Sequence, residues 1–206
     1  MKKEQKTELT KERIIKAAVQ EFGIKGYAGF TLNALCNEYG ISKGLLYHNF
    51  GGKDELYLIC VEKCLTEVTD YLKEQGGQID LQKYMEFRFH YFSGHPLFSR
   101  IFFEAVLQPP EQLKDEIKKL KREFDLFNRK VYSNAISGLV LREGVTCGDA
   151  MEYYEIMQEM FNGYFSSPAY AGKDFGFLVA DHEAKLSKMI EFMLYGIAER
   201  LSLIHI

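Results

Sequence analysis

The chain has 206 residues, of which 47% are hydrophobic and 27% are charged, and its formal net charge is −3. This length and balance are typical of a water-soluble globular protein with one large or two small domains. No apolar run approaches the roughly 18 residues that a membrane helix needs, and the charged N-terminal segment lacks the apolar block of a signal peptide. We therefore expect a cytoplasmic protein.

All of the secondary-structure elements expected along the chain are helices. Apolar residues recur at spacings of three and four, and sustained alternation is absent, which predicts an all-α protein of about nine helices. Pro110 fits the first turn of one helix, and Thr146 with Asp149 predicts a capping box at the start of another. The expected helices cover residues 10 to about 23–26, 31–39, 42–50, 53–74, 80–93, 97–107, 110–142, 148–166 and 182–204, with a loop at 167–181.

Charge is distributed unevenly between the two ends of the chain. Residues 1–53 carry nine Lys and Arg against five Asp and Glu, a net charge of +4, whereas the remainder has a net charge of −7. A basic segment on an acidic body suggests that this end of the molecule meets a polyanion.

Residues 31–50 have the pattern of a helix-turn-helix, in which Gly40 and Ile41 form the tight turn. Gly40 permits the left-handed backbone that ends a helix abruptly, and Ile41 can fill the angle between the two helices. A helix as short as residues 42–50 is unstable alone, so it needs packing partners. The side chains expected to supply that packing are Leu35, Leu46 and Phe50.

The opposite face of the second helix is polar and aromatic. A helix N-terminus offers free N–H groups and a partial positive charge to phosphate, while a ring or a donor can reach sugar-phosphate or a thymine methyl group. Lys53 and Thr31, which begin the following and the preceding helix, repeat the phosphate-binding arrangement. The predicted DNA-binding residues are Thr31, Ser42, Lys43, Gly44, Leu45, Tyr47, His48 and Lys53.

The stretch FTLNALCNEYGISKGLLYHNFGGKDELY resembles the DNA-binding segment of the tetracycline-repressor (TetR) family of bacterial transcriptional regulators. The upstream stretch RIIKAAVQEFGIKGYAGFT resembles the first helix of that family, so the resemblance covers residues 10–57. It implies a helix-turn-helix DNA-binding domain at residues 1–53 and a helical ligand-binding and dimerisation domain at 54–206. The residues that match the family pattern without gaps are Thr31, Leu35, Gly40, Ile41, Ser42, Gly44, Leu46, Tyr47, Phe50, Lys53 and Leu56.

Departures from the family pattern at four positions bear on which operator is read. Leu45 stands where the family often has Thr or Ser, and Asn49 replaces a frequent aromatic residue beside His48. Cys36 and Tyr39 take positions usually held by alanine, and both are expected to pack between helices. A cysteine at position 36 also leaves open a redox-sensing regulator.

The C-terminal half carries the expected dimer interface and effector pocket. In the family the last two helices pair with their copies in a four-helix interface, and both helices here have broad apolar faces. The aromatic segment 84–110 contains charged residues. Arg88 and Glu104 either pair with each other, face solvent, or orient a ligand in an apolar cavity. The predicted dimer residues are Met157, Met160, Met189, Met193 and Ile197. The predicted pocket residues are Arg88, His90, Phe103, Glu104, Tyr132, Phe161 and Tyr164.

These observations predict a homodimeric, ligand-responsive transcriptional regulator, expected to be a repressor, that binds a palindromic operator in double-stranded DNA and is released by a small, partly apolar effector. The alternatives are the redox-sensing regulator acting through Cys36 and a helical small-molecule-binding protein without a role on DNA. No close-spaced nucleophile–base pair or set of metal ligands is present, so we expect no enzyme, no metal and no cofactor.

Overall fold

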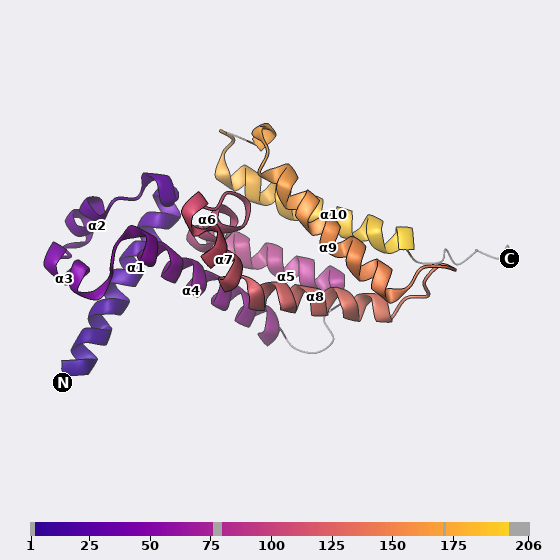
Figure 1. Ribbon diagram of the computed structural model, residues 1–206, viewed down its shortest axis with the longest axis horizontal. Coiled ribbons are helices and arrows are strands. Elements are labelled where there is room, and N and C mark those ends of the chain that lie inside the picture. Colours follow the sequence, from indigo (N-terminus) through magenta and orange to yellow (C-terminus); the bar gives the residue numbers. More distant parts are fainter. Residues whose placement is uncertain (1–2, 76–79, 171, 198–206) are drawn as a thin grey trace. The chain divides into compact units, whose positions relative to one another are not determined.

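The computed structural model describes residues 3–75, 80–170 and 172–197, and in these ranges it contains α-helices and two short 3₁₀ helices but no strand (Figure 1). The all-α class is thereby confirmed, with ten α-helices where about nine were expected. No helix of the described ranges is long and apolar enough to cross a lipid bilayer. The elements are α1 (Lys3–Gly29), α2 (Leu32–Tyr39), α3 (Lys43–Asn49), α4 (Lys53–Glu74), α5 (Leu81–Gly94), α6 (Pro96–Leu107), η1 (Glu111–Leu113), α7 (Lys114–Leu120), α8 (Arg122–Ser137), α9 (Cys147–Phe165), η2 (Pro168–Tyr170) and α10 (Phe175–Ile197).

The described residues pack into two compact units. The first unit extends to Asp70 and includes Phe92–Glu123, and the second consists of Tyr71–Tyr91 and the chain from Phe124 onward. The expected functional boundary after residue 53 falls at the start of α4, inside the first unit. The units are defined by packing rather than by function, so the division into a DNA-binding and a ligand-binding domain stays a prediction.

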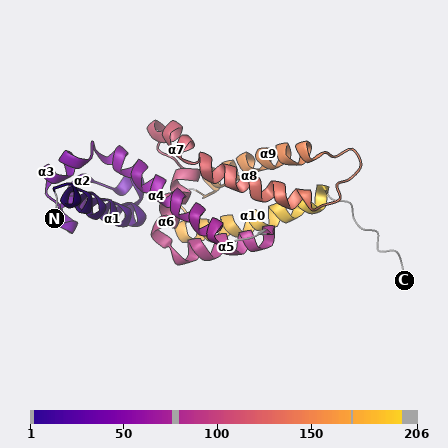
Figure 2. The same ribbon diagram turned by 90° about the horizontal axis from the view of Figure 1, so that it is seen from below.

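In the first unit, an aromatic cluster holds α1 against α4. Figures 1 and 2 show α2 and α3 beside these two helices. The ring of Phe22 stacks on that of Phe30 with centroids 3.8 Å apart and meets the edge of Tyr57 at 5.0 Å. All three side chains are almost completely buried. Aromatic pairs in these arrangements stabilise a core beyond the area that they bury, so the cluster fixes the segments that flank the helix-turn-helix.

In the second unit, the long helices α8, α9 and α10 pack together with the greater part of α5 (Figure 2). Tyr132 of α8 stacks on Tyr154 of α9 with centroids 4.0 Å apart. Phe161 and Phe165 of α9 meet the ring of His182 on α10 at 5.0 and 4.8 Å. The interior of this unit is therefore aromatic, with titratable groups among the rings.

Three predicted helix boundaries are wrong, and the predicted capping box is confirmed. The expected helix 110–142 is divided into η1, α7 and α8, and Pro110 precedes η1 instead of opening an α-helix. The expected loop 167–181 contains η2 and the start of α10, because the Asp174 carboxylate accepts a hydrogen bond from the Phe177 N–H at 2.9 Å and caps the helix early. Helix α1 begins at Lys3 and continues to Gly29 across a kink at Gly26. The capping box of Thr146 and Asp149 starts α9 as expected.

Candidate nucleic-acid interface

The turn between α2 and α3 is fixed by hydrogen bonds at both helix ends. Thr31 caps α2 by accepting from the Ala34 N–H at 3.1 Å, and Ser42 caps α3 by accepting from the Leu45 N–H at 3.2 Å. Gly40 has the left-handed backbone that the sequence predicts, with φ 61° and ψ 38°. These local bonds satisfy backbone groups that would otherwise be open, so the two short helices keep a defined geometry.

A further cap, which the sequence did not reveal, comes from α1. The Nη2 atom of Arg13 donates to the carbonyl oxygen of Tyr39 at 2.9 Å and to that of Gly40 at 3.4 Å. A guanidinium group here complements the partial negative charge at the C-terminus of α2. In the sequence, Arg13 is recognisable only as a basic residue of the preceding helix. Because it lies 26 residues from Tyr39, the local pattern does not indicate the contact.

The two faces of α3 separate as predicted. Leu46 is completely buried, and Phe50 and Ile41 at its two ends are 5% and 4% exposed. Leu35 of α2 is also completely buried. The exposed positions are Ser42, Lys43, Gly44, Leu45, Tyr47 and His48.

Two residues that depart from the family pattern have different surroundings: the Asn49 side chain bonds to its own helix, whereas the Leu45 side chain is exposed. The Nδ2 atom of Asn49 donates to the Leu45 carbonyl oxygen at 2.7 Å, so its side chain is engaged with its own helix. Leu45 is 39% exposed and Tyr47 is 59% exposed. Cys36 is buried and Tyr39 is half-buried, which fits their expected packing role.

Lys53 begins α4 and lies over the ring of Tyr27, with its Nζ atom 4.2 Å from the ring centroid. The Tyr27 hydroxyl donates to the Asp54 carboxylate and accepts from Gln112 Nε2 at 2.6 Å. Burial and the Asp54 carboxylate raise the pKa of Tyr27 to about 12, so its hydroxyl keeps its proton. Lys53 therefore extends from an ordered aromatic surface.

A short recognition helix with a capped turn, a buried inner face and an exposed outer face defines the helix-turn-helix class of DNA-binding domain. Residues 14–59 match the family model described as bacterial regulatory proteins, tetR family. This N-terminal segment therefore matches the TetR family, and the resemblance seen in the sequence is confirmed.

Proteins of similar sequence bear the names of transcriptional regulators. The chain is 28% identical over 152 residues to the uncharacterized HTH-type transcriptional regulator YerO of Bacillus subtilis, covering 70% of this chain and 49% of YerO. It is 28% identical over 117 residues to IcaR of Staphylococcus epidermidis, the negative regulator of a biofilm operon, covering 56% of this chain and 63% of IcaR. The matches thus span about half to two thirds of these relatives.

Similar solved structures extend the likeness in fold to nearly the whole chain. A TetR-family regulator from Pectobacterium atrosepticum has a TM-score of 0.64 and 20% identity, with 97% of this chain and 99% of that chain covered. FadR of Bacillus subtilis, solved in complex with stearoyl-CoA, has a TM-score of 0.61 and 16% identity, with 90% and 98% covered. At these identities the likeness establishes the fold.

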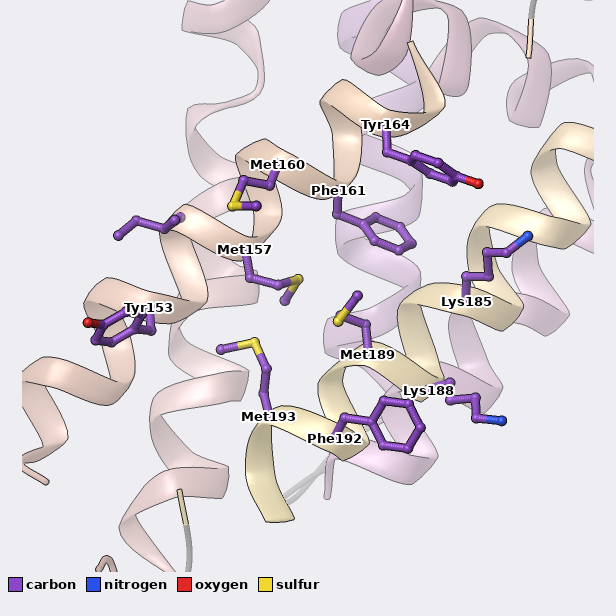
Figure 3. Close-up of a pocket in the computed structure, with 11 residues that line it drawn as sticks. Tyr153, Met157, Met160, Phe161, Tyr164, Lys185, Lys188, Met189, Phe192 and Met193 are labelled. Atoms are coloured by element: carbon purple, nitrogen blue, oxygen red, sulfur yellow. The ribbon is translucent and has the colours of Figure 1, made fainter. Parts of the chain in front are cut away.

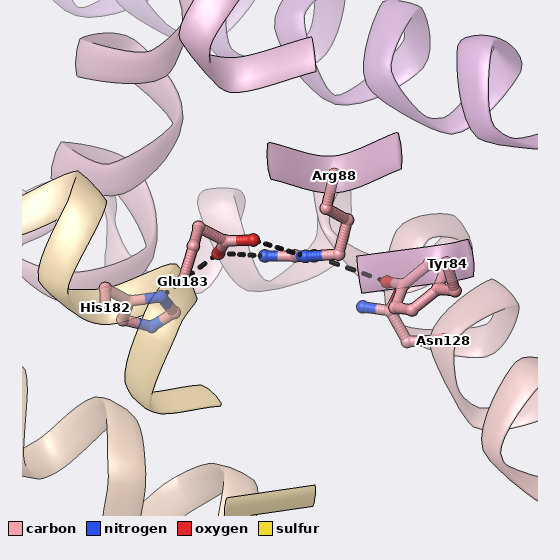
Figure 4. Close-up of polar contacts among 5 residues, drawn as sticks. All are labelled: Tyr84, Arg88, Asn128, His182 and Glu183. Atoms are coloured by element: carbon pink, nitrogen blue, oxygen red, sulfur yellow. Dashed lines mark hydrogen bonds and ion pairs between the residues drawn. The ribbon is translucent and has the colours of Figure 1, made fainter. Parts of the chain in front are cut away.

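Of the predicted pocket residues, Arg88 is at the centre of a buried polar cluster in the second unit (Figure 4). Its Nε and Nη2 atoms donate to the two Glu183 carboxylate oxygens at 2.9 and 2.6 Å, and its Nη1 atom donates to the Tyr84 hydroxyl at 3.3 Å. Tyr84 in turn donates to Asn128. The alternative pairing of Arg88 with Glu104 is wrong, because the carboxylate facing Arg88 is that of Glu183.

The charges of this cluster balance one another. Burial alone would raise the pKa of the Glu183 carboxyl, but the Arg88 guanidinium and His182 lower it to about 2. His182 Nδ1 lies 3.1 Å from a Glu183 oxygen. The sequence contained a signal that was missed, since Glu183 shares the spacing of the inward residues Leu186 and Ile190 on α10.

The other predicted pocket residues lie in different surroundings. His90 is exposed on α5, and Tyr132 is completely buried with a hydroxyl that has no hydrogen-bond partner among the described residues. Phe103 and Glu104 belong to the first unit, where Phe103 packs on Phe92 and Phe102. Glu104 accepts hydrogen bonds from the Tyr27 N–H and from the Tyr57 hydroxyl in the same unit.

Phe161 and Tyr164 line an open groove between α9 and α10, with a volume of about 670 Å³ (Figure 3). All four predicted dimer residues with described side chains line the same groove; Ile197 ends α10, and its side chain lies outside the described residues. Met160 is 71% exposed and Phe192 is 60% exposed. The groove residues are Tyr153, Ile156, Met157, Met160, Phe161, Tyr164, Lys185, Lys188, Met189, Phe192 and Met193.

Proposed function

We propose that the chain is a transcriptional regulator that binds double-stranded operator DNA through the exposed face of α3. The observation that carries this proposal is the orientation of α3. Its apolar side chain Leu46 is completely buried, whereas Lys43, Tyr47 and His48 are all exposed on a fixed turn. Cations supply the sequence-independent attraction to phosphate, and the exposed side chains of a recognition helix can reach base edges in the major groove.

The groove between α9 and α10 supports a homodimer as the DNA-binding form. An exposed apolar surface of this kind is typical of an interaction site, and a second copy of the chain would cover Met160 and Phe192. Two recognition helices related by a two-fold axis would then read a palindrome. We include Met157, Met160, Met189 and Met193 in this interface, and Ile197 on the strength of its position in the sequence.

We further propose that a small, partly apolar effector alters the affinity for DNA. Support comes from the aromatic interior of the second unit, where Arg88 Cζ lies 5.7 Å from the centroid of the Tyr84 ring and Tyr132 stacks on Tyr154. The Tyr132 hydroxyl has no hydrogen-bond partner within the described part of the chain. FadR was solved with stearoyl-CoA, which gives a precedent for an effector with apolar and charged parts. The effector can shift the DNA equilibrium only by as much as it prefers the non-binding state.

This proposal assigns the chain to the cytoplasm, where operator DNA lies, and assigns it no catalytic activity. The relatives favour a regulator over a small-molecule-binding protein without a role on DNA. Cys36 is 7% exposed, which limits the access of an oxidant to its thiol, so redox sensing through Cys36 is not part of the proposal.

The test is a fluorescence-anisotropy titration of a pool of palindromic duplexes at two salt concentrations. We expect salt-dependent binding that selects a palindrome. Lys43→Ala and Lys53→Ala should each lower the steepness of the dependence of log K on log salt by about 0.9 per lost phosphate contact, hence by about 2 for a dimer. Lys63→Ala is the matched control, because Lys63 is exposed on α4 about 15 Å beyond Lys53. Unchanged steepness in both test variants would remove these lysines from the interface.

A further inference from the structure

A polar junction in the first unit joins the kink of α1 to α6. Gly26 has φ 69° and ψ 176°, so α1 is interrupted there and the Tyr27 N–H points away from the preceding helix. This N–H donates to both Glu104 carboxylate oxygens, at 3.0 and 2.9 Å, and the Tyr57 hydroxyl donates to the same carboxylate at 3.3 Å. Hydrogen bonds to an ionised carboxylate are among the stronger ones in proteins, so Glu104 holds the backbone at Tyr27.

The Tyr27 side chain is fixed at both its ring and its hydroxyl. The ring meets Tyr57 edge-on with centroids 4.9 Å apart. Its hydroxyl is held between Asp54, the second residue of α4, and Gln112 of η1. A phenol ring restrained by the backbone, by a neighbouring ring and by two side chains is a rigid surface.

Lys53 rests on that rigid surface. A long lysine side chain in solvent samples many rotamers and loses this freedom when it binds a phosphate. The electrostatic attraction between the ammonium group and the ring face, at 4.2 Å, restricts Lys53 before DNA arrives. The restriction lowers the entropic cost of contact and directs the ammonium group.

We propose that Tyr27 is a positioning residue that holds Lys53 for contact with a DNA phosphate, and that Glu104 secures Tyr27 in this role. The inference rests on the proposed DNA-binding function and on Lys53 as a phosphate contact. It assigns to Glu104, which the sequence suggested as a pocket residue, a part in DNA binding instead.

The test is a double-mutant cycle on non-specific DNA binding, because a phosphate contact needs no operator sequence. The probe is a fluorescein-labelled random-sequence 30-bp duplex in about 50–200 mM KCl, the range in which phosphate contacts dominate binding. Tyr27→Leu removes the ring face and should weaken binding by about fivefold for a dimer, the size expected of one exposed cation–π contact per subunit. Tyr27→Phe keeps the ring face but loses the two hydrogen bonds of the hydroxyl, so it should weaken binding less than Tyr27→Leu.

The decisive comparison is made in the Lys53→Ala background. If Tyr27 acts through Lys53, Tyr27→Leu has no further effect there, and its salt dependence in the wild-type background matches that of Lys53→Ala. Equal losses in both backgrounds would mean that Tyr27 only supports the fold, and would overturn the proposal.

A second cycle uses Glu104→Gln with Lys53→Ala and leaves the ring of Tyr27 intact, so the question stays answerable if Tyr27→Leu does not fold. We expect weaker binding from Glu104→Gln that disappears when Lys53 is absent; additivity would overturn the role of Glu104. Absence of wild-type binding at 50 mM KCl would refute the proposed function itself, whereas wild-type binding with additive cycles would refute this inference alone.

Discussion

Removing the charge of Glu183 should destabilise the second unit strongly. Both side chains of the ion pair are nearly inaccessible, with 4% of the Arg88 side chain and 2% of the Glu183 side chain exposed. Glu183→Gln keeps the size of the side chain and one oxygen acceptor. It removes the carboxylate charge that faces the buried Arg88 guanidinium.

The magnitude follows from the geometry of the pair. Two unit charges about 4 Å apart attract by about 4 kcal/mol at an effective dielectric constant of about 20, and breaking a buried pair by removing one partner costs about 3–5 kcal/mol. In a chain of this size each kcal/mol lowers Tm by roughly 2–4 °C. We therefore expect Glu183→Gln to lower Tm by about 6–20 °C.

Replacing both members of the pair should restore much of the loss. In Arg88→Met/Glu183→Leu no charge is left unpaired, and Tyr84 still has Asn128 as an acceptor for its hydroxyl. Buried ion pairs replaced by apolar residues of similar volume are often neutral or more stable. The double variant should accordingly be more stable than Glu183→Gln.

Thermal unfolding followed by circular dichroism at one fixed protein concentration measures these differences, since the proposed dimerisation would make Tm depend on concentration. Glu155→Gln is the control, because it breaks an ion pair with Arg129 in which both side chains are more than half exposed. Such an exposed pair contributes about 0–1 kcal/mol. A Tm loss in Glu183→Gln no larger than that in Glu155→Gln would refute the reasoning.

Three other predictions concern pH, the kink in α1 and the groove. The pKa of Glu183 is about 2 in the folded chain, below its ordinary value of about 4.3. The ionised carboxylate therefore stabilises the fold fully above about pH 4.3, and this stabilisation is lost as pH falls toward 2. Tm measured from pH 7 to 2 should drop mainly below pH 4, and the drop should be smaller in Glu183→Gln. Gly26→Ala should lower the free energy of unfolding in urea by about 1–3 kcal/mol, because the backbone conformation at this position is nearly exclusive to glycine and a Cβ would lie 2.9 Å from Glu104 Oε1. Unchanged stability would mean that the kink relaxes freely. Met160→Glu should give a monomer by light scattering after size exclusion. Ser187→Glu should stay dimeric, because Ser187 is an exposed residue of α10 outside the groove. A dimeric Met160→Glu variant would exclude the groove as the interface.

The sequence predicted the helix-turn-helix well because its determinants are local. The cap at Thr31, the left-handed Gly40 and the cap at Ser42 each act within four residues of their own position. The break at Lys121 carries neither glycine nor proline, and nothing in the local pattern marks it. Contacts between distant residues were equally hidden: Glu183 lies 95 residues from Arg88, and Glu104 lies 77 residues from Tyr27. Spacing indicates which face of a helix turns inward but does not identify the residue that it meets.

The division of labour within α3 has a consequence for the evolution and redesign of its target preference. Leu46 anchors the helix, and Ser42 and Phe50 fix its two ends. The exposed side chains between them hold little of the fold together, and surface substitutions of this kind usually change stability by no more than about 0.5 kcal/mol. If α3 reads the operator as proposed, new operators can thus be acquired by exchanging Leu45, Tyr47 or His48 one at a time without passing through an unfolded intermediate. A library randomised at these positions, with the anchor and caps kept, would remain a population of folded proteins that differ in what they read.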